Sequence, residues 1–163
     1  MDRLRVVPAQ EMELDTVLGI LGEAAEWLAS RGIPDQWKPG SFLTESFLDQ
    51  IRRGEVYLAR LGEEVVGTIT LQWTDETFWK EAPPDAGYVH KLAVKRSFAG
   101  RGLGLRMLEW AARQASMAGK KYLRLDCMAD NKGICEYYER AGFMPRGNVQ
   151  HSRWKLRLYE KQL

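Results

Sequence analysis

The chain has 163 residues, a length that fits one domain with a core large enough to fold without disulfides or bound metal. Its 24 lysines and arginines against 22 acidic residues leave a formal net charge of +2, so neither a nucleic-acid binder nor an acidic tail is indicated. The N-terminal segment lacks the apolar core of a signal peptide, and no run approaches the roughly 20 apolar residues of a membrane span. We therefore expect a soluble, cytoplasmic protein without a nucleic-acid or membrane partner.

The first half of the chain alternates between strand and helix patterns. Residues 4–9 predict a strand, and apolar residues at three-to-four-residue spacing over 14–32 predict a long amphipathic helix. A second, shorter helix is predicted over 44–54, between a threonine suited to an N-cap and a closing glycine. Residues 55–73 then read as an antiparallel hairpin, and 74–87 as a polar loop with several aromatic residues.

The second half predicts strand, helix, strand, helix and strand. The strands are expected over 88–94, 121–129 and 153–161, and the helices over 103–119 and 133–143. This order of elements predicts one α/β domain with a mixed sheet.

Two cysteines, Cys127 and Cys135, fall in a predicted strand and a predicted helix. There is no CxxC motif, and only His90 and His151 could add soft ligands. This set is too small for a zinc site, and a disulfide is not expected in a chain without an export signal. We predict unreactive thiols and no metal.

Three glycines stand at alternate positions in "SFAGRGLGLRM", residues 97–107, where the strand 88–94 gives way to a helix. Glycine weakens helices, so Gly100, Gly102 and Gly104 need another reason to be there. A strand, a glycine loop and a helix N-terminus together present backbone N–H groups to a phosphate. A flexible surface turn is the alternative.

Two common phosphate-binding motifs do not fit this segment. A P-loop requires lysine and then serine or threonine after its last glycine, but Leu105 and Arg106 follow here. A dinucleotide-binding G-x-G-x-x-G would place its third glycine at Leu105 or Met107.

The glycine segment and the region after it resemble the acetyl-CoA-binding core of the GNAT superfamily of N-acetyltransferases. "LAVKRSFAGRGLGLRMLEWA" contains the family's glycine loop, with Ala99 in place of its leading Arg or Gln. "LRLDCMADNKGICEYYERAGF" contains Asn131, Tyr138 seven residues later, and then Gly142 and Phe143. The resemblance implies a mixed, mostly antiparallel sheet flanked by helices, with a V-shaped splay between two parallel strands.

The resemblance also implies a function and a set of site residues. An acetyl group would pass from acetyl-CoA to a primary amine, and the strand's main chain would meet the pantetheine arm at Leu92, Ala93 and Val94. A backbone N–H near Leu92 would polarise the acetyl carbonyl, Asn131 would contact the arm, and Tyr138 would protonate the leaving thiolate. The pyrophosphate would be held by Ala99, Gly100, Arg101, Gly102, Leu103 and Gly104.

The attacking ammonium must lose a proton to some base, and His90 is the first candidate. Strict alternation in "YVHKLAV" would place His90 on the same face as Leu92 and Val94, with Val89 and Lys91 opposite. Arylalkylamine acetyltransferases have histidine in a similar "H-x-L-A-V" setting. The alternatives are a histidine that only packs in the sheet, and a base provided by Glu76 or a water molecule.

The acceptor is not named by the sequence. Segments that wall the acceptor site in the resembling family carry Trp27, Arg31, Trp37, Trp73, Phe78 and Trp79, and an aromatic pocket suits an amine cation. A cation could also be attracted by Glu76, Glu81 and Asp85. We expect a small-molecule amine as acceptor and allow for a homodimer. The alternatives are a protein N-terminus or lysine, and a non-catalytic CoA-binding module.

Overall fold

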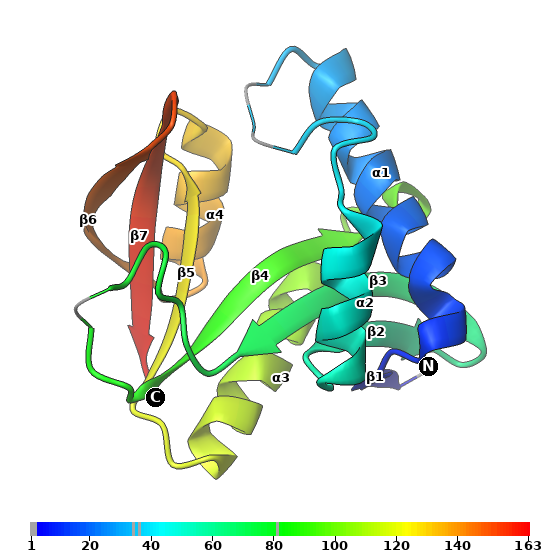
Figure 1. The fold of residues 1–163 in the computed structure, drawn as a ribbon, viewed down its shortest axis with the longest axis horizontal. Coiled ribbons are helices and arrows are strands. Elements are labelled where there is room, and N and C mark those ends of the chain that lie inside the picture. Colours follow the sequence, from blue (N-terminus) through cyan, green and yellow to red (C-terminus); the bar gives the residue numbers. More distant parts are fainter. Residues whose placement is uncertain (1–2, 34, 36, 81) are drawn as a thin grey trace.

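The computed structural model describes residues 3–33, 35, 37–80 and 82–163. Seven strands form one sheet in the order β1-β2-β3-β4-β5-β7-β6, and every neighbouring pair except β4 and β5 is antiparallel (Figure 1). The strands are β1 (Leu4–Pro8), β2 (Val56–Leu61), β3 (Glu64–Gln72), β4 (Ala86–Val94), β5 (Tyr122–Met128), β6 (Met144–His151) and β7 (Trp154–Gln162). The predicted mixed, mostly antiparallel sheet is confirmed.

Among the described residues, four α-helices cover the two faces of the sheet. They are α1 (Leu14–Ser30), α2 (Thr44–Arg52), α3 (Leu103–Met117) and α4 (Lys132–Arg140). The apolar stripes of α1 and α2 pack with β2 in one core cluster, and those of α3 and α4 pack on the opposite face in a second, larger cluster. Each helix buries the stripe that its sequence period predicts.

The parallel strands β4 and β5 pair only at their beginnings. Ala86–Tyr88 pairs with Tyr122–Arg124, and beyond these residues the two strands diverge (Figure 1). The buried Arg124 ties the closed end together, because its Nε donates to Glu160 at 2.7 Å and its Nη1 donates to the Tyr88 hydroxyl at 2.9 Å. The V-shaped splay expected from the resemblance is therefore present.

A β-bulge interrupts β4 just past the point of divergence. His90 pairs with Thr70 and Ala93 with Thr68, so β4 holds one more residue than β3 over this interval, and Lys91 adopts φ 51°. The bulge reverses the alternation: Leu92 packs against the α3 side, as Val89 does, and Ala93 joins the cluster under α1 and α2.

The prediction that His90 shares a face with Leu92 and Val94 is therefore wrong. Side chains alternate only where each residue has one partner, and the extra residue at Lys91 shifts every later side chain to the other face.

The sequence did not predict β6. Its side chains are almost all exposed, so it shows no apolar period, and it is held by pairing with β7. Both cysteines are free thiols, with 3.8 Å between the Sγ atoms of Cys127 and Cys135. Within the described ranges, none of the helices has the length and apolar character that crossing a membrane requires.

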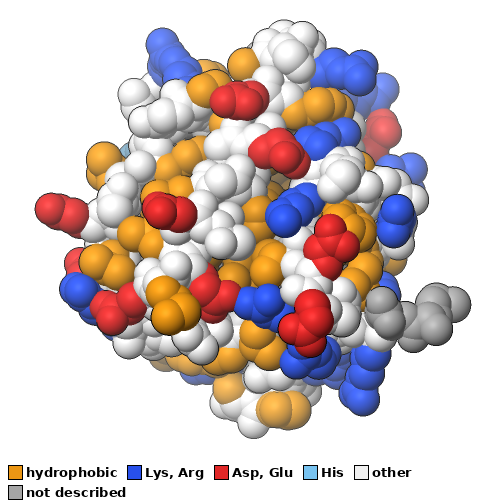
Figure 2. Space-filling view, turned by 90° about the vertical axis from the view of Figure 1, so that its right-hand side faces the viewer, with side chains coloured by type: hydrophobic (Ala, Val, Ile, Leu, Met, Phe, Trp, Pro, Cys, Tyr) orange, Lys and Arg blue, Asp and Glu red, His pale blue; other side chains and the backbone are white. Residues whose placement is uncertain are grey.

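On the face shown in Figure 2, acidic and basic side chains are interspersed, with small groups of hydrophobic side chains between them. This face does not carry the continuous basic surface that is typical of nucleic-acid binding.

Candidate active site

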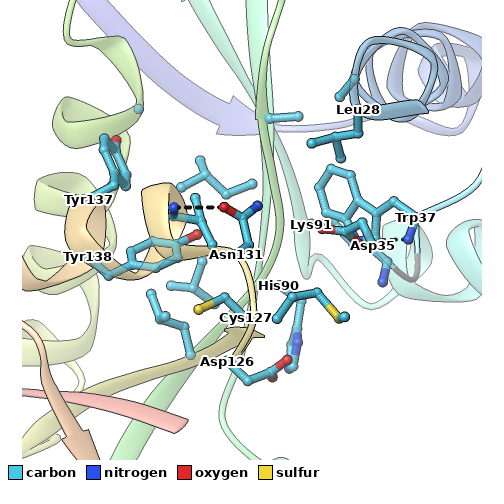
Figure 3. Close-up of a pocket in the computed structure, with 18 of the residues that line it drawn as sticks. Leu28, Asp35, Trp37, His90, Lys91, Asp126, Cys127, Asn131, Tyr137 and Tyr138 are labelled. Carbon is cyan, nitrogen blue, oxygen red and sulfur yellow. Dashed lines mark hydrogen bonds between the residues drawn. The ribbon is translucent and has the colours of Figure 1, made fainter. Parts of the chain in front are cut away.

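A cavity of about 620 Å³ lies where β4 and β5 diverge. Residues 89–94 of β4 and 125–128 of β5 form two of its walls, the start of α4 forms another, and α1 with the loop after it closes the opposite side (Figure 3). Because β4 no longer pairs with β5 here, main-chain groups of its last residues border the cavity. The cavity therefore combines an extended backbone with side chains from several helices, strands and loops.

Most residues predicted to bind the pantetheine arm line this cavity. Leu92, Ala93 and Val94 lie along its β4 wall, and Asn131 and Tyr138 lie across from them. Asn131 is the N-cap of α4, since its Oδ1 accepts a hydrogen bond of 3.1 Å from the backbone N–H of Ile134 (Figure 3).

The glycine segment lies at the rim of the cavity and leads into α3. Gly100 and Gly102 have φ of 81° and 72°, in the left-handed region that favours glycine, and Gly102 is the N-cap of α3. Of residues 99–104, only Gly104 lines the cavity, and the Leu103 side chain is buried in the core. Any role for Ala99, Gly100, Arg101, Gly102 and Leu103 in binding must come from the exposed loop and the first N–H groups of α3.

Tyr138 reaches from α4 into the cavity (Figure 3), and only 9% of its surface is exposed. Burial raises the pKa of its hydroxyl, so the group keeps its proton at neutral pH. The ring is fixed by packing against Phe143 and Tyr159. A protonated, fixed hydroxyl in a closed site is able to act as an acid.

Tyr137 packs against the core and also lines the cavity. A Cβ at Gly104 would lie 2.6 Å from the Tyr137 hydroxyl oxygen. This close approach explains why position 104 has no side chain.

His90 lies at the far side of the cavity from Tyr138, between two carboxylates. Its Nε2 is 3.5 Å from Asp75 Oδ2, and one ligating atom from each of Asp75, His90 and Asp126 lies within 4.8 Å of the other two. His90 and Asp126 come from β4 and β5 and point toward one another (Figure 3). We call these three residues the carboxylate–histidine cluster.

The cluster has perturbed acid–base properties. Burial, and then the negative charge of Asp75, raise the pKa of Asp126 to about 7. Burial lowers the pKa of His90, although Asp75 opposes this effect. A carboxylate that titrates near neutrality is a typical active-site feature.

Sequence reasoning missed Asp75 and Asp126. The one local signal for Asp126 was a carboxylate inside a strand that is otherwise largely buried, directly before a cysteine. For Asp75 there was no local signal, since its Oδ1 simply accepts from the backbone N–H groups of Thr77 and Phe78 in a loop turn.

The residues predicted to wall the acceptor site divide into two groups. Those that line the cavity are Trp27, Trp37 and Phe78. The others lie elsewhere: Arg31 stacks over Trp27, Trp73 is 41% exposed beside Lys120, and Trp79 packs on Arg124.

Two of the acidic loop residues proposed to attract a cation, Glu76 and Asp85, are not among those that line the cavity. Glu76 is exposed, Asp85 lies 3.5 Å from Arg124, and Glu81 falls outside the described residues. Among the described residues, Asp35 and Asp126 instead bring negative charge to the cavity lining, and Asp75 lies next to it, within 4.8 Å of Asp126 and His90.

Comparison with known proteins gives a consistent result. The family model described as "Acetyltransferase (GNAT) family" matches residues 22–143. A Bacillus subtilis protein described as the uncharacterized N-acetyltransferase YesJ is 34% identical over 151 residues, which is 87% of this chain and 82% of that protein.

Solved structures resemble the whole chain. A GNAT-family acetyltransferase from Listeria monocytogenes matches with a TM-score of 0.82 and 26% identity, over 98% of this chain and 95% of that one. The PaiA N-acetyltransferase of Thermoplasma acidophilum, solved in complex with coenzyme A, matches with a TM-score of 0.77 and 17% identity over 99% of both chains.

Proposed function

The chain belongs to the acetyltransferase (GNAT) family and is an acetyl-CoA-dependent N-acetyltransferase, and from this premise we propose that its acceptor is the primary amine of a small molecule. The observation that carries the proposal is the aromatic lining of the cavity. Trp27, Trp37 and Phe78 wall it, and the total volume of about 620 Å³ is in the range of small-ligand sites. A peptide acceptor would favour an extended, strand-lined groove.

The bound co-substrate supplies a thioester, and the chain's residues orient and polarise it. We assign the free backbone of Leu92, Ala93 and Val94 to the pantetheine arm and a backbone N–H near Leu92 to the acetyl oxygen, where charge develops. The loop over 99–104 and the start of α3 hold the pyrophosphate, and Asn131 contacts the arm.

Tyr138 protonates the departing thiolate in this proposal. Its hydroxyl is protonated and fixed, on the α4 side of the cavity. At the opposite side, the carboxylate–histidine cluster accepts the proton that the acceptor loses, and His90 is the base that the sequence indicates.

A panel of primary amines, assayed for thiol release from acetyl-CoA, tests the acceptor class. We expect turnover of at least one small amine. Peptides with free N-termini or lysines form the second arm, and turnover of peptides alone would refute a small-molecule acceptor. Binding of acetyl-CoA without any turnover would favour the non-catalytic alternative. Whether the chain forms the homodimer that the sequence analysis allows for is tested separately, by light scattering of the purified protein.

A further inference from the structure

The carboxylate–histidine cluster contains a buried oxygen that lacks a hydrogen-bond donor. The Asp75 side chain is 5% exposed, and its Oδ2 has no hydrogen-bond partner among the described residues. Its Oδ1, in contrast, accepts from two backbone N–H groups at 3.1 and 3.0 Å. An unpaired buried carboxylate oxygen is costly, so this one is suited to a donor brought by a ligand.

The charges around the cluster favour a cationic donor. Asp126 of β5 has four ionisable neighbours. They are Asp75 of the β3–β4 loop, His90 and Lys91 of β4, and Asp35 of the loop after α1. From α4 and β5 it faces Tyr138 and Cys127, whose pKa values are raised mainly by burial, so both stay neutral. Burial also keeps His90 neutral. Among the described groups that act on Asp126, Lys91 brings a positive charge, and Asp75 and Asp35 bring negative charges.

Two carboxylates and a neutral imidazole within 4.8 Å of one another match the three N–H donors of a primary ammonium group. We propose that Asp75, His90 and Asp126 bind the acceptor's ammonium group, and that Asp126 takes the proton which this group loses before attack. His90 is then a positioning residue. The inference rests on the proposed function. It adds that the acceptor amine enters the site as a charged ammonium group.

The proton balance is complete. The ammonium gives one proton to the Asp126 carboxylate, and the freed nitrogen lone pair forms the C–N bond to the acetyl carbon. The C–S bond breaks, the thiolate takes the Tyr138 proton, and Tyr138 recovers a proton from the acylated nitrogen. Asp126 finally releases its proton to water. A carboxylate with a pKa of about 7 is a better base for this step than one with the ordinary value of about 3.9.

The binding test needs no acetyl transfer. Calorimetry with butylammonium chloride, and with 1-butanol as the uncharged analogue, compares the wild type with Asp126→Asn and with Asp130→Asn. Asp130 is the matched control, because it is an exposed aspartate four residues further on and does not line the cavity. We expect at least a tenfold loss of butylammonium affinity in Asp126→Asn, none in Asp130→Asn, and no measurable binding of 1-butanol.

The proton-transfer test is the pH profile of kcat/KM with any amine that the enzyme acetylates. In the wild type, kcat/KM should rise with pH through a titration near pH 7, and we call this rise the limb. It should be absent in Asp126→Asn and retained in His90→Gln. Asp75→Asn keeps the oxygen that accepts from Thr77 and Phe78 but removes the negative charge, so its limb should move to lower pH.

Several results would overturn the assignment. One is a limb that persists in a folded Asp126→Asn enzyme, and another is a limb lost only in His90→Gln, which would make His90 the base. Saturable zinc binding that acetylation requires would make the cluster a metal site. If only peptide amines are acetylated, the small-molecule acceptor is refuted, and the same pH comparison on the peptide still decides the role of Asp126.

Discussion

Replacing Gly104 by alanine should destabilise the protein only while Tyr137 keeps its hydroxyl. The new Cβ would lie 2.6 Å from that oxygen, whereas the next ring atom, Cζ, is 3.7 Å away. Overpacking of this kind costs about 1–3 kcal/mol, and alanine in a helix gains about 1 kcal/mol over glycine. The net effect of Gly104→Ala is therefore a loss of about 0–2 kcal/mol in the free energy of unfolding.

Tyr137→Phe removes the clash and leaves an ordinary contact. In that background Gly104→Ala should stabilise the protein by about 0.5–1 kcal/mol, from helix propensity alone. The coupling energy between the two positions is then about 1–3 kcal/mol.

Urea denaturation of the wild type, the two single variants and the double variant measures this coupling. Gly133→Ala is the matched control, because Gly133 is also the second residue of its helix, and its Cβ would meet only Asn131 Oδ1, at 3.7 Å. It should stabilise equally with Tyr137 or Phe at position 137. Additivity of Gly104→Ala and Tyr137→Phe within about 0.5 kcal/mol would refute the reasoning. Calorimetry should also show weaker acetyl-CoA binding for Gly104→Ala in both backgrounds, since the new methyl group would enter the cavity.

Three further predictions concern Arg124, Tyr138 and Asp126. Arg124→Met should lower the free energy of unfolding by about 3 kcal/mol in urea, because it leaves Glu160 buried with less compensation; a loss under about 1 kcal/mol would contradict this. Tyr138→Phe should lower kcat about 100-fold while the Kd for acetyl-CoA changes only a few-fold, and full activity would show that water protonates the thiolate. Asp126 binds its proton more tightly in the folded chain, with a pKa of about 7, so wild-type stability should fall as the pH rises from about 4 to 7. Asp126→Asn should lack that slope and be more stable than the wild type at pH 8, by roughly 1–3 kcal/mol. If the urea midpoints of the two proteins changed with pH in the same way, the raised pKa would be contradicted.

The parts of the fold that the sequence predicted are those with local causes. Apolar spacing located the four helices, and the glycine segment marked the entry to α3, because helix periodicity and positive φ depend on neighbouring residues. The splay between β4 and β5 came only from the family resemblance. The roles assigned to His90, Leu92, Asn131 and Tyr138 remain predictions, although the structure brings all four residues to one cavity.

The parts that were missed depend on contacts between distant segments. β6 has no apolar period, since pairing with β7 alone defines it. The bulge at Lys91 uses positive φ without a glycine to signal it. Asp126 looked like an ordinary strand residue, but the fold places it against His90, where burial raises its pKa.

The short pairing of β4 with β5 leaves two strand edges facing each other in the interior of a seven-stranded sheet. At a protein surface such edges recruit the strands of other chains and promote aggregation, so they are usually blunted by charges or bulges. Here residues of α1, of α4 and of the loop after α1 border the gap. In the proposed function, the pantetheine arm, which has amide groups of its own, would enter this gap and hydrogen-bond to the free strand edge. On this proposal, the unpaired edges would favour a co-substrate thin enough to fit between two strands.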